Sequence, residues 1–307
     1  MMMARRSTSL KLYSTYLSRW HSFCKDKHWD HIHASVQQGL AFLQYLLTLG
    51  LGYSVINTAR SALSALIILP SGSTFGSHTD VMLFMRGVFN IKPIQPKYVS
   101  TWDPTQVLNF LESWNPASAI SLEKLTLKVV VLILLVTGQR PQIVHKLNIT
   151  NLKTGTDTHE FALELTDFKQ GRVNYKPNTI LLRAYPPNKR LCVFHYLSIY
   201  LQRTALLRKD NTQMILAFKR PYKPASPNTI SRWIKCVLQQ AGVDVETFSA
   251  GSTRSASTSK ARQQGAPIQQ ILDMGGWSRE TTFNKFYNRS VLPTPFANRV
   301  LHNAKQD

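Results

Sequence analysis

The sequence has few acidic residues and few cysteines. Its 307 residues include only 16 Asp and Glu against 37 Lys and Arg, which gives a formal net charge of +21. Positive charge of this size opposes compaction through self-repulsion, and it indicates a polyanionic partner. The three cysteines are Cys24, Cys192 and Cys236. Because they are odd in number and widely separated, they argue against a disulfide framework and are typical of a reducing compartment.

The sequence also lacks a hydrophobic run long enough to cross a membrane. Its most apolar stretch, VVVLILLV at Val129–Val136, is too short to span a bilayer and predicts a buried helix instead. The first residues, MMMARRSTSL, contain no apolar segment of the kind found in a secretory signal. We therefore expect a soluble intracellular protein with no membrane contact.

Common metal and nucleotide motifs are missing. There is no CxxC pair, no HExxH and no GxxxxGK[ST], so zinc-finger, zincin and P-loop assignments have no support. The only cluster to weigh is Cys24, His28, His31 and His33, whose spacing fits no standard zinc site. A polar helix end is the favoured interpretation and a metal site the alternative. We expect neither a metal nor a cofactor.

Apolar residues at helical spacing dominate the first third of the chain. The stripe Leu10, Tyr13, Leu17, Trp20 and Cys24 predicts one helix. Three more are expected: Val36–Leu49 ending at Gly50, a helix capped by Ser54 that runs to about Leu69 before Pro70, and a shorter one in VMLFMRGVF.

The stretch NIKPIQPKYVSTWDP is rich in proline and has no period, which predicts a linker with a domain boundary near Lys97. The predicted domains are thus 1–96 and 97–307. Asp103 followed by Pro104 is a favourable helix start. The segments EFALELTDFKQGRVNY and NTILLRAYP alternate apolar and polar residues and predict short strands.

The rest of the second domain is predicted to be helical. The expected helices are the buried one that ends at Val136, then Leu191–Leu206, Pro227–Gln240 after Ser226, Ser252–Arg262, Ile268–Met274 and Arg279–Tyr287. The predicted fold is mainly α with a small antiparallel β-sheet (α+β), preceded by an all-helical domain.

Two arginines lie in unusual local settings. Arg140 follows the buried helix between Gly138 and Pro141, so a tight turn between two helices would hold it rigidly. Arg254 lies in AGSTRSASTSKA, whose composition is that of a flexible linker. If a helix starts at Ser252, however, its amides and dipole favour an anion there, and the small residues permit close approach.

Three more residues complete the candidate set: Lys169 on the turn of the strand pair, Trp277 after two glycines, and Tyr287 on the helix that follows. Each candidate also has a structural interpretation. Arg140 could be a capping charge, Lys169 an ordinary hairpin lysine, and Tyr287 a core tyrosine.

In order along the chain, these residues and their surroundings resemble the tyrosine recombinases (the phage integrase superfamily). The resemblance is nearest to the recombinases of DIRS- and Ngaro-type retrotransposons and, more distantly, of Cryptons. It rests on GYSVINTARSALSAL, VTGQRPQIVHKLNI, AYPPNKRLCVFHYLSIYL, SPNTISRWIKCVL and AGSTRSASTSKARQQGAPIQQILDMGGWSRETTFNKFYNR. It implies a helical core-binding domain followed by a tyrosine-recombinase catalytic domain.

The family's chemistry fits these residue types. A tyrosine hydroxyl attacks a DNA phosphodiester and forms a 3′-phosphotyrosyl link, and two arginines replace the metal ions of other phosphoryl-transfer sites. The resemblance implies that Arg140 and Arg254 bind the phosphate and that Tyr287 is the nucleophile. It also implies that Lys169 protonates the leaving 5′-oxygen and that Trp277 donates its indole N–H to a phosphate oxygen.

The sequence departs from the family at two positions. Three residues before the second arginine the family usually has His or Lys, but this chain has Gly251. Three residues after the first arginine many members have an acidic residue, but this chain has Ile143. Since general acid–base help is worth about 10²–10⁴-fold in rate, Gly251 puts cleavage in question.

The expected partner is double-stranded DNA, bound by a homo-oligomer that forms a synaptic tetramer, and the expected setting is a mobile element acting in the nucleus. Six further cations are expected to contact DNA: Arg60, Lys219, Arg220, Lys223, Arg232 and Lys235. The first alternative is a catalytically decayed or domesticated protein that only binds DNA. A second, a basic helical protein that binds RNA or an acidic protein, leaves the ordered series of site residues unexplained.

Overall fold

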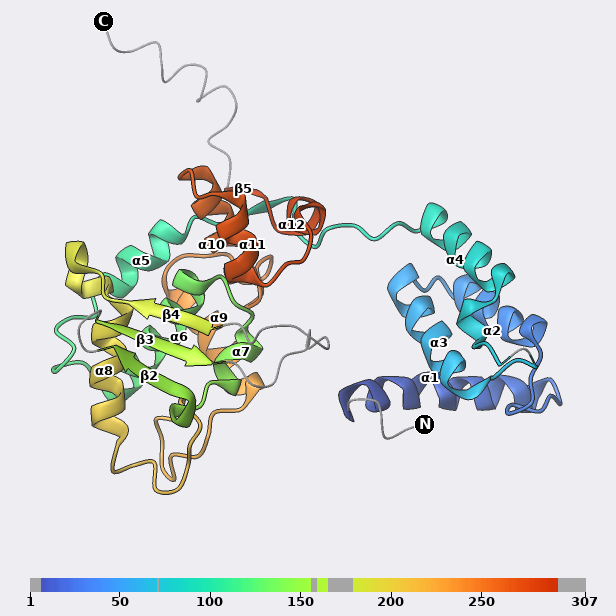
Figure 1. The fold of residues 1–307 in the computed structure, drawn as a ribbon, viewed down its shortest axis with the longest axis horizontal. Coiled ribbons are helices and arrows are strands. Elements are labelled where there is room, and N and C mark those ends of the chain that lie inside the picture. Colours follow the sequence, from blue (N-terminus) through green and yellow to red (C-terminus); the bar gives the residue numbers. More distant parts are fainter. Residues whose placement is uncertain (1–6, 71, 156–158, 165–178, 292–307) are drawn as a thin grey trace, which may run out of the picture. The chain divides into compact units, whose positions relative to one another are not determined.

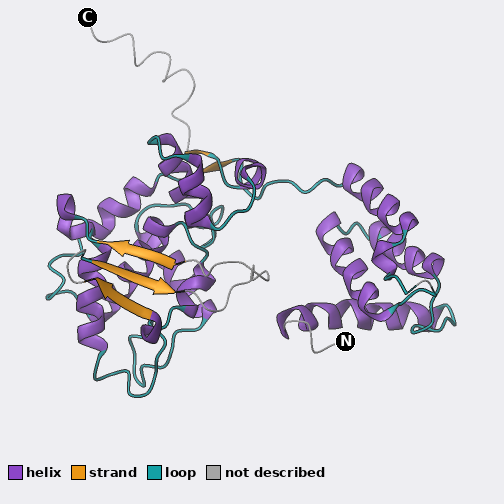
Figure 2. Cartoon of the chain, viewed as in Figure 1, coloured by secondary structure: helices purple, strands orange, loops and turns teal. Residues whose placement is uncertain are grey.

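The computed structural model describes residues 7–70, 72–155, 159–164 and 179–291. The chain divides into two compact units, Met1–Gln95 and Pro96–Asp307. Figures 1 and 2 show that helices dominate both units and that the three-stranded sheet lies in the second. The predicted fold class, mainly α with a small antiparallel sheet, is confirmed.

The first unit is all-helical within its described residues. Its helices are α1 (Ser7–Asp26), α2 (Val36–Thr48), α3 (Tyr53–Leu66) and α4 (Thr79–Ile91), with a 3₁₀ turn at Phe75–Ser77. Its core is apolar and contains Trp20, Phe42, Ile56 and Val81, all fully buried. The four helices predicted from apolar spacing are all present.

Helix α3 begins and ends earlier than the sequence pattern predicts. Its N-cap is Gly52 rather than Ser54, and its last residue is Leu66 rather than Leu69. The chain leaves the helix because Ile68 forms a β-bridge with Thr74, and the amide of Leu69 donates to Ser73 O at 2.9 Å. A residue before proline disfavours helical geometry, which explains the extended chain ahead of Pro70.

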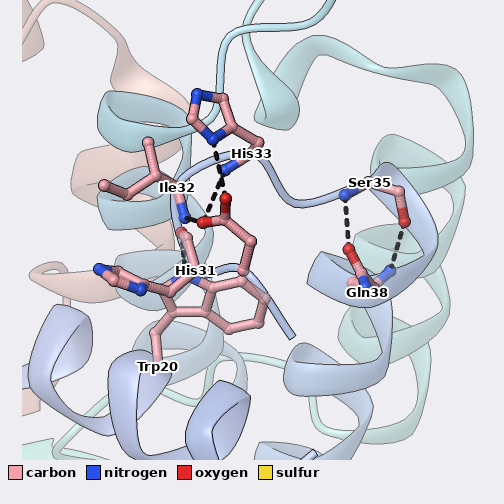
Figure 3. A network of polar contacts seen from close by, with 7 residues as sticks. Trp20, His31, Ile32, His33, Ser35 and Gln38 are labelled. Atoms are coloured by element: carbon pink, nitrogen blue, oxygen red, sulfur yellow. Dashed lines mark hydrogen bonds and ion pairs between the residues drawn. The ribbon is translucent and has the colours of Figure 1, made fainter. Parts of the chain in front are cut away.

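The histidine cluster of the first unit forms the loop between α1 and α2. Figure 3 shows the Trp20 indole donating to His31 O, at 2.9 Å, and Ser35 forming a capping box with Gln38 at the start of α2. The ring of His33 is 2.8 Å from the Asp30 carboxylate, and burial raises the pKa of the Cys24 thiol to about 11. These groups serve local structure, and the described residues contain no group of three metal-ligating side chains.

The second unit is built around one helix that is buried on nearly every side. This helix, α6 (Leu122–Thr137), packs against α8 (Val193–Thr204), α9 (Pro227–Gln240), α10 (Ser252–Gln263) and strand β4 (Thr179–Arg183). The other helices are α5 (Pro104–Glu112), α7 (Pro141–Lys146), α8 (Val193–Thr204), α9 (Pro227–Gln240), α10 (Ser252–Gln263), α11 (Ile268–Gly275) and α12 (Glu280–Phe286), with 3₁₀ turns at Ile149–Asn151 and Pro186–Leu191. The Ser226 cap of α9 and the Asp103–Pro104 start of α5 are confirmed.

The sheet has three antiparallel strands in the order β2–β3–β4, as Figure 1 shows. They are β2 (Leu152–Gly155), β3 (Glu160–Glu164) and β4 (Thr179–Arg183). In β3 and β4 the buried residues alternate with more exposed ones, as the sequence predicts. Strand β2 was not predicted, because only four residues contribute and they do not alternate in burial.

The second half of the segment predicted as a linker forms ordered structure with the rest of the second unit. Strand β1 (Ser100–Thr101) pairs in parallel with β5 (Ser290–Val291), near the end of the described chain. The next residue, Trp102, is fully buried, and its indole donates to Ser252 Oγ at 2.8 Å. The interpretation as linker is therefore wrong for Tyr98 and for Ser100–Trp102, because Tyr98 packs against Phe248, Ser100 and Thr101 pair with β5, and Trp102 is buried within the second unit.

No helix in the described part of the chain is long and apolar enough to cross a membrane.

One cation is enclosed in the core of the second unit. Lys128 on α6 is fully buried, and its Nζ donates to Trp114 O at 2.8 Å and lies 3.7 Å from the centre of the Tyr196 ring. Burial lowers the pKa of Lys128 to about 8, although the charge of Glu112 acts in the opposite direction.

We expect Lys128→Met to be at least as stable as the wild type near pH 7, and this advantage to shrink by about pH 9.5. Above about pH 8 the folded chain releases the Lys128 proton while the unfolded chain still holds it. The free energy of unfolding of the wild type therefore rises with pH. Urea unfolding at the two pH values measures the difference. The exposed Lys124 on the same helix provides the control variant Lys124→Met. A difference between Lys128→Met and wild type that stays constant over this range would contradict the prediction.

Candidate active site

The small-residue stretch at 250–261 is a buried helix and not a hinge. Helix α10 begins at Ser252, as predicted, and most of its residues are buried. Its hydroxyl groups are used: Ser252 Oγ accepts from Trp102, and Ser257 Oγ donates to Leu135 O at 2.6 Å. Short side chains let α10 approach its neighbours closely, which places Arg254 inside the unit.

Arg254 is held by main-chain carbonyls at the ends of two helices. It is 1% exposed, and it donates from Nη1 to Gly138 O at 2.8 Å and from Nη2 to Gly275 O at 2.5 Å. Gly138 ends α6 in the left-handed conformation, with φ 59°, and Gly275 is the last residue of α11. The guanidinium therefore ties together α6, α10 and α11. Its buried Nε has no hydrogen-bond partner among the residues that the structure describes.

Arg140 and Arg254 lie close enough to influence each other. Arg140 is the N-cap of α7, in extended conformation and half-buried, in the turn that the sequence predicts. Burial, together with the charge of Arg140, lowers the pKa of Arg254 to about 9, although Tyr287 acts in the opposite direction. Two guanidinium groups in one place repel each other. An anion bound between them would relieve this repulsion.

Two aromatic rings lie beside Arg254. Its guanidinium carbon is 3.7 Å from the centre of the Trp277 ring and 5.2 Å from that of Tyr287, and the two rings are 4.8 Å apart. Trp277 is 8% exposed, and its buried Nε1 has no hydrogen-bond partner in the described part of the chain. The glycines before Trp277 are required, because a Cβ at Gly275 would collide with its ring and Gly276 has φ 66°.

The backbone of Tyr287 is fixed by α10. Tyr287 ends α12, and its carbonyl oxygen accepts hydrogen bonds from both Ser255 Oγ and Ser259 Oγ, each at 2.8 Å. Ser259 Oγ also accepts from the amide of Arg289 at 3.0 Å. The same helix thus positions the phenol and the buried guanidinium.

Gly251 is the N-cap of α10 and is exposed. Among the described residues, a Cβ placed there would meet Ser249 Oγ at 3.8 Å, which is an ordinary van der Waals contact. Its φ of −71° suits any residue, so neither space nor backbone geometry requires glycine at this position.

Four of the five predicted catalytic residues lie together: Arg140, Arg254, Trp277 and Tyr287. The fifth, Lys169, falls outside the described residues.

The predicted DNA-contacting cations lie in three places. Lys219, Arg220 and Lys223 are exposed on a turn closed by the hydrogen bond from Tyr222 N to Lys219 O at 2.9 Å. Arg232 and Lys235 are exposed on α9. Arg60, on α3 of the first unit, is half-buried and donates to Gly76 O at 3.0 Å, so part of its guanidinium is used within the fold.

The family is shown by comparison with known proteins. Residues 103–291, more than half of the chain, match the phage integrase family, and the chain belongs to this family of tyrosine recombinases. A search of curated protein sequences found no match.

Solved structures show the same fold. Lambda integrase (residues 75–356), solved as a dimer bound to a COC′ core site, has 15% identity and a TM-score of 0.56; the match covers 92% of this chain and 89% of that one. XerH recombinase bound to its difH substrate has 13% identity and a TM-score of 0.55, over 89% and 70% of the two chains. The Tn1549 transposon integrase, in complex with transposon right-end DNA, has 14% identity and a TM-score of 0.51, over 89% and 86%.

Sequence reasoning missed the hydroxyls that support the site. Ser255 and Ser259 are four residues apart, which places them on one face of a helix, and this spacing was the available signal. Without knowledge of the partner, a serine-rich stretch remained compatible with a linker.

Removal of both serine hydroxyls should loosen Tyr287. The double variant Ser255→Ala and Ser259→Ala loses two hydrogen bonds to the same carbonyl, each worth about 1 kcal/mol of stability. We expect faster amide hydrogen exchange in residues 280–289, measured by mass spectrometry. Ser257→Ala is the matched control, because its hydroxyl bonds to Leu135 O on α6. Equal exchange rates at 280–289 in the double variant and the control would contradict this role.

Proposed function

We propose that this protein cleaves and rejoins DNA strands through a covalent 3′-phosphotyrosyl intermediate. The observation that carries the proposal is the placement of Tyr287 beside Arg254. Arg254 in turn lies close enough to Arg140 to be affected by its charge. The described residues thus unite a nucleophilic hydroxyl and two guanidinium groups. Phosphate oxygens match the planar donor fork of arginine.

In the proposed reaction the Tyr287 oxygen attacks the phosphorus of a DNA phosphodiester. A bond forms between the tyrosine oxygen and phosphorus, the bond from phosphorus to the 5′-oxygen breaks, and the electron pair stays on that oxygen. Lys169, assigned by resemblance, gives it a proton, and the tyrosine proton passes to solvent or a neighbouring base. Arg140 and Arg254 stabilise the charge on the phosphate oxygens. The reverse reaction rejoins a strand without ATP, because the phosphoester is conserved.

Double-stranded DNA is the proposed partner. The net charge of +21 favours a polyanion, and the lambda, XerH and Tn1549 proteins of the same fold were solved with DNA. We further propose that protomers assemble on DNA, with a synaptic tetramer as the working form, and the lambda integrase dimer on its core site supports such assembly. The first unit would act as the core-binding domain and the second as the catalytic domain.

A DNA-binding protein that no longer cleaves is the second candidate. Gly251 favours it, because this position offers no side chain to donate a hydrogen bond or carry a proton. Binding would survive this loss, since it depends on phosphate contacts rather than on the reaction.

The finer proposal is a recombinase from a DIRS- or Ngaro-type retrotransposon or a Crypton, acting in the nucleus. It rests on the sequence motifs alone. The DNA flanking the gene tests it: repeats beside a reverse transcriptase frame would support a retrotransposon, and their absence would count against one.

Tyr287→Phe should abolish covalent capture of DNA and leave binding intact. The probe is a pool of duplexes with a random core and a nick beside it, so that a short strand diffuses away after cleavage and traps the intermediate. We expect the wild type to form adducts stable to detergent and Tyr287→Phe to form none, because it lacks the attacking oxygen. Adducts that persist in Tyr287→Phe would assign the nucleophile elsewhere. No adduct with either protein, but tight binding by both, would favour the second candidate.

Removal of the positive charges from the turn before α9 should lower the affinity for DNA. It should also make this affinity less dependent on salt concentration. In the triple variant Lys219→Ala, Arg220→Ala, Lys223→Ala, each lost phosphate contact reduces the slope of log affinity against log salt by about 0.9. Fluorescence anisotropy with a mixed-sequence duplex measures this slope. Lys153→Ala is the control, because Lys153 is exposed and paired with Glu164 at 2.5 Å. An unchanged slope in the triple variant would remove this turn from the interface.

A further inference from the structure

The turn before α10 carries a polar cluster that the proposed chemistry has not used. The amide of Ser252 donates to Ser249 O at 2.9 Å, and this turn places Ser249 beside Gly251 at the start of the helix. Within the described part of the chain, and apart from adjacent residues and the backbone of α10, Ser249 Oγ is the neighbour that lies within 4 Å of the position where a Cβ of residue 251 would be. The hydroxyl therefore borders the space in which the family's usual His or Lys side chain would begin.

Two residues from the segment before β1 converge on this hydroxyl. The phenol oxygen of Tyr98 is 2.7 Å from Ser249 Oγ, and Lys97 Nζ donates to the same oxygen at 3.2 Å. The Tyr98 ring packs against Phe248, with ring centres 5.4 Å apart, and Lys97 Nζ lies 5.2 Å from the centre of the Tyr98 ring. Lys97, Tyr98 and Ser249 form what we name the 97–98–249 cluster.

Two hydrogen bonds of the cluster have fixed directions. The ammonium of Lys97 can only donate. The Tyr98 oxygen accepts from the amide of Ser249 at 3.1 Å, and either hydroxyl can donate across the 2.7 Å contact between Tyr98 and Ser249. When Tyr98 is the donor, both lone pairs of Ser249 Oγ are engaged, and the Ser249 proton can be donated to a bound anion.

The surroundings also strengthen this donor. Burial acts to raise the pKa of Tyr98, but the hydrogen bonds to Ser249 and the charge of Lys97 outweigh it, so the pKa falls below its usual value. Lys97 Nζ donates to Ser249 Oγ and the amide of Ser249 donates to the Tyr98 oxygen, and hydrogen bonds in such a chain polarise one another. Ser249 is half-buried, so water competes less for the hydrogen bond of its hydroxyl than it would on an open surface.

We propose that Ser249, polarised by Lys97 and Tyr98, donates to the scissile phosphate the hydrogen bond that residue 251 cannot give. The proposal rests on the proposed function. Ser249 would touch a non-bridging phosphate oxygen, while Tyr98 and Lys97 are positioning residues that act through it. No proton is transferred in this step. The hydroxyl stabilises the charge that develops on the oxygen, and the ammonium of Lys97 adds a favourable field.

A double-mutant cycle between positions 249 and 251 tests this role. Single-turnover cleavage is measured on duplexes recovered from the nicked random pool, for wild type, Ser249→Ala, Gly251→His and the double variant. Gly251→His fits without a clash, because the site is open and its φ is ordinary. We expect Ser249→Ala to slow the wild type by about 10²-fold, the effect of removing one preorganised oxyanion donor. In the Gly251→His background the same change should have little effect, since the histidine supplies the donor.

Tyr98→Phe provides a second variant that keeps the ring on Phe248. It should slow the wild type less than Ser249→Ala does, because the serine remains, and it too should be nearly silent in the Gly251→His background. Thermal unfolding of every variant serves as the folding control. A merely structural role of Ser249 would lower the rate by the same factor in both backgrounds, and that result would overturn the proposal.

The remaining outcomes also decide. Full wild-type activity in Ser249→Ala would overturn the proposal while the proposed function stands. So would an inert wild type that becomes active in Gly251→His, because the cluster then fails to replace the missing side chain. If wild type and Gly251→His are both inert, the proposed function itself fails, and the role of Ser249 falls with it.

Discussion

The architecture of the second unit depends on burying one arginine. Arg254 donates to carbonyl oxygens at the ends of two helices, Gly138 after α6 and Gly275 in α11, and its guanidinium lies on the Trp277 ring. An enclosed cation is costly unless it is hydrogen-bonded, so the fold must bring both carbonyls and the aromatic face to it. Gln139 adds a second link, from its side-chain amide to Met274 O. Burial of this charge therefore fixes the relative positions of the segments that carry Arg140, Trp277 and Tyr287.

The hydroxyl-rich composition of α10 follows from the same constraint. A helix of large apolar residues could not come close enough for Arg254 to reach both loops, and a Cβ at Gly138 would already press on the Thr258 methyl group. Short side chains solve the distance problem but bury little apolar surface. Each buried hydroxyl then needs a hydrogen-bond partner, and Ser255, Ser257 and Ser259 find theirs in main-chain carbonyls. The composition of a linker and that of a tightly packed helix are therefore alike, and only the partners distinguish them.

Local patterns predicted the helices well, because capping and apolar spacing are local properties. The Ser226 cap, the Asp103–Pro104 start and the tight turn at Arg140 were all readable from the sequence. What could not be read were pairings between distant segments. Strands β1 and β5 have two residues each and are almost two hundred positions apart, so neither shows a pattern alone. For the same reason Lys97 and Tyr98 were assigned to a linker, although their partner Ser249 lies about 150 residues further on.

Gly251 separates the fold of this site from its chemistry. The position is exposed, its backbone is ordinary and a side chain would fit, so stability does not require glycine there. The arrangement of Arg254, Trp277 and Tyr287 is by contrast fixed by contacts that also hold the helices together. The lack of a side chain at Gly251 thus leaves the interior of the site intact. It also leaves the neighbouring Ser249 hydroxyl uncovered at the start of α10. The site can therefore lack a hydrogen-bond donor at position 251 and still keep the geometry that the Ser249 hydroxyl needs in order to donate in its place.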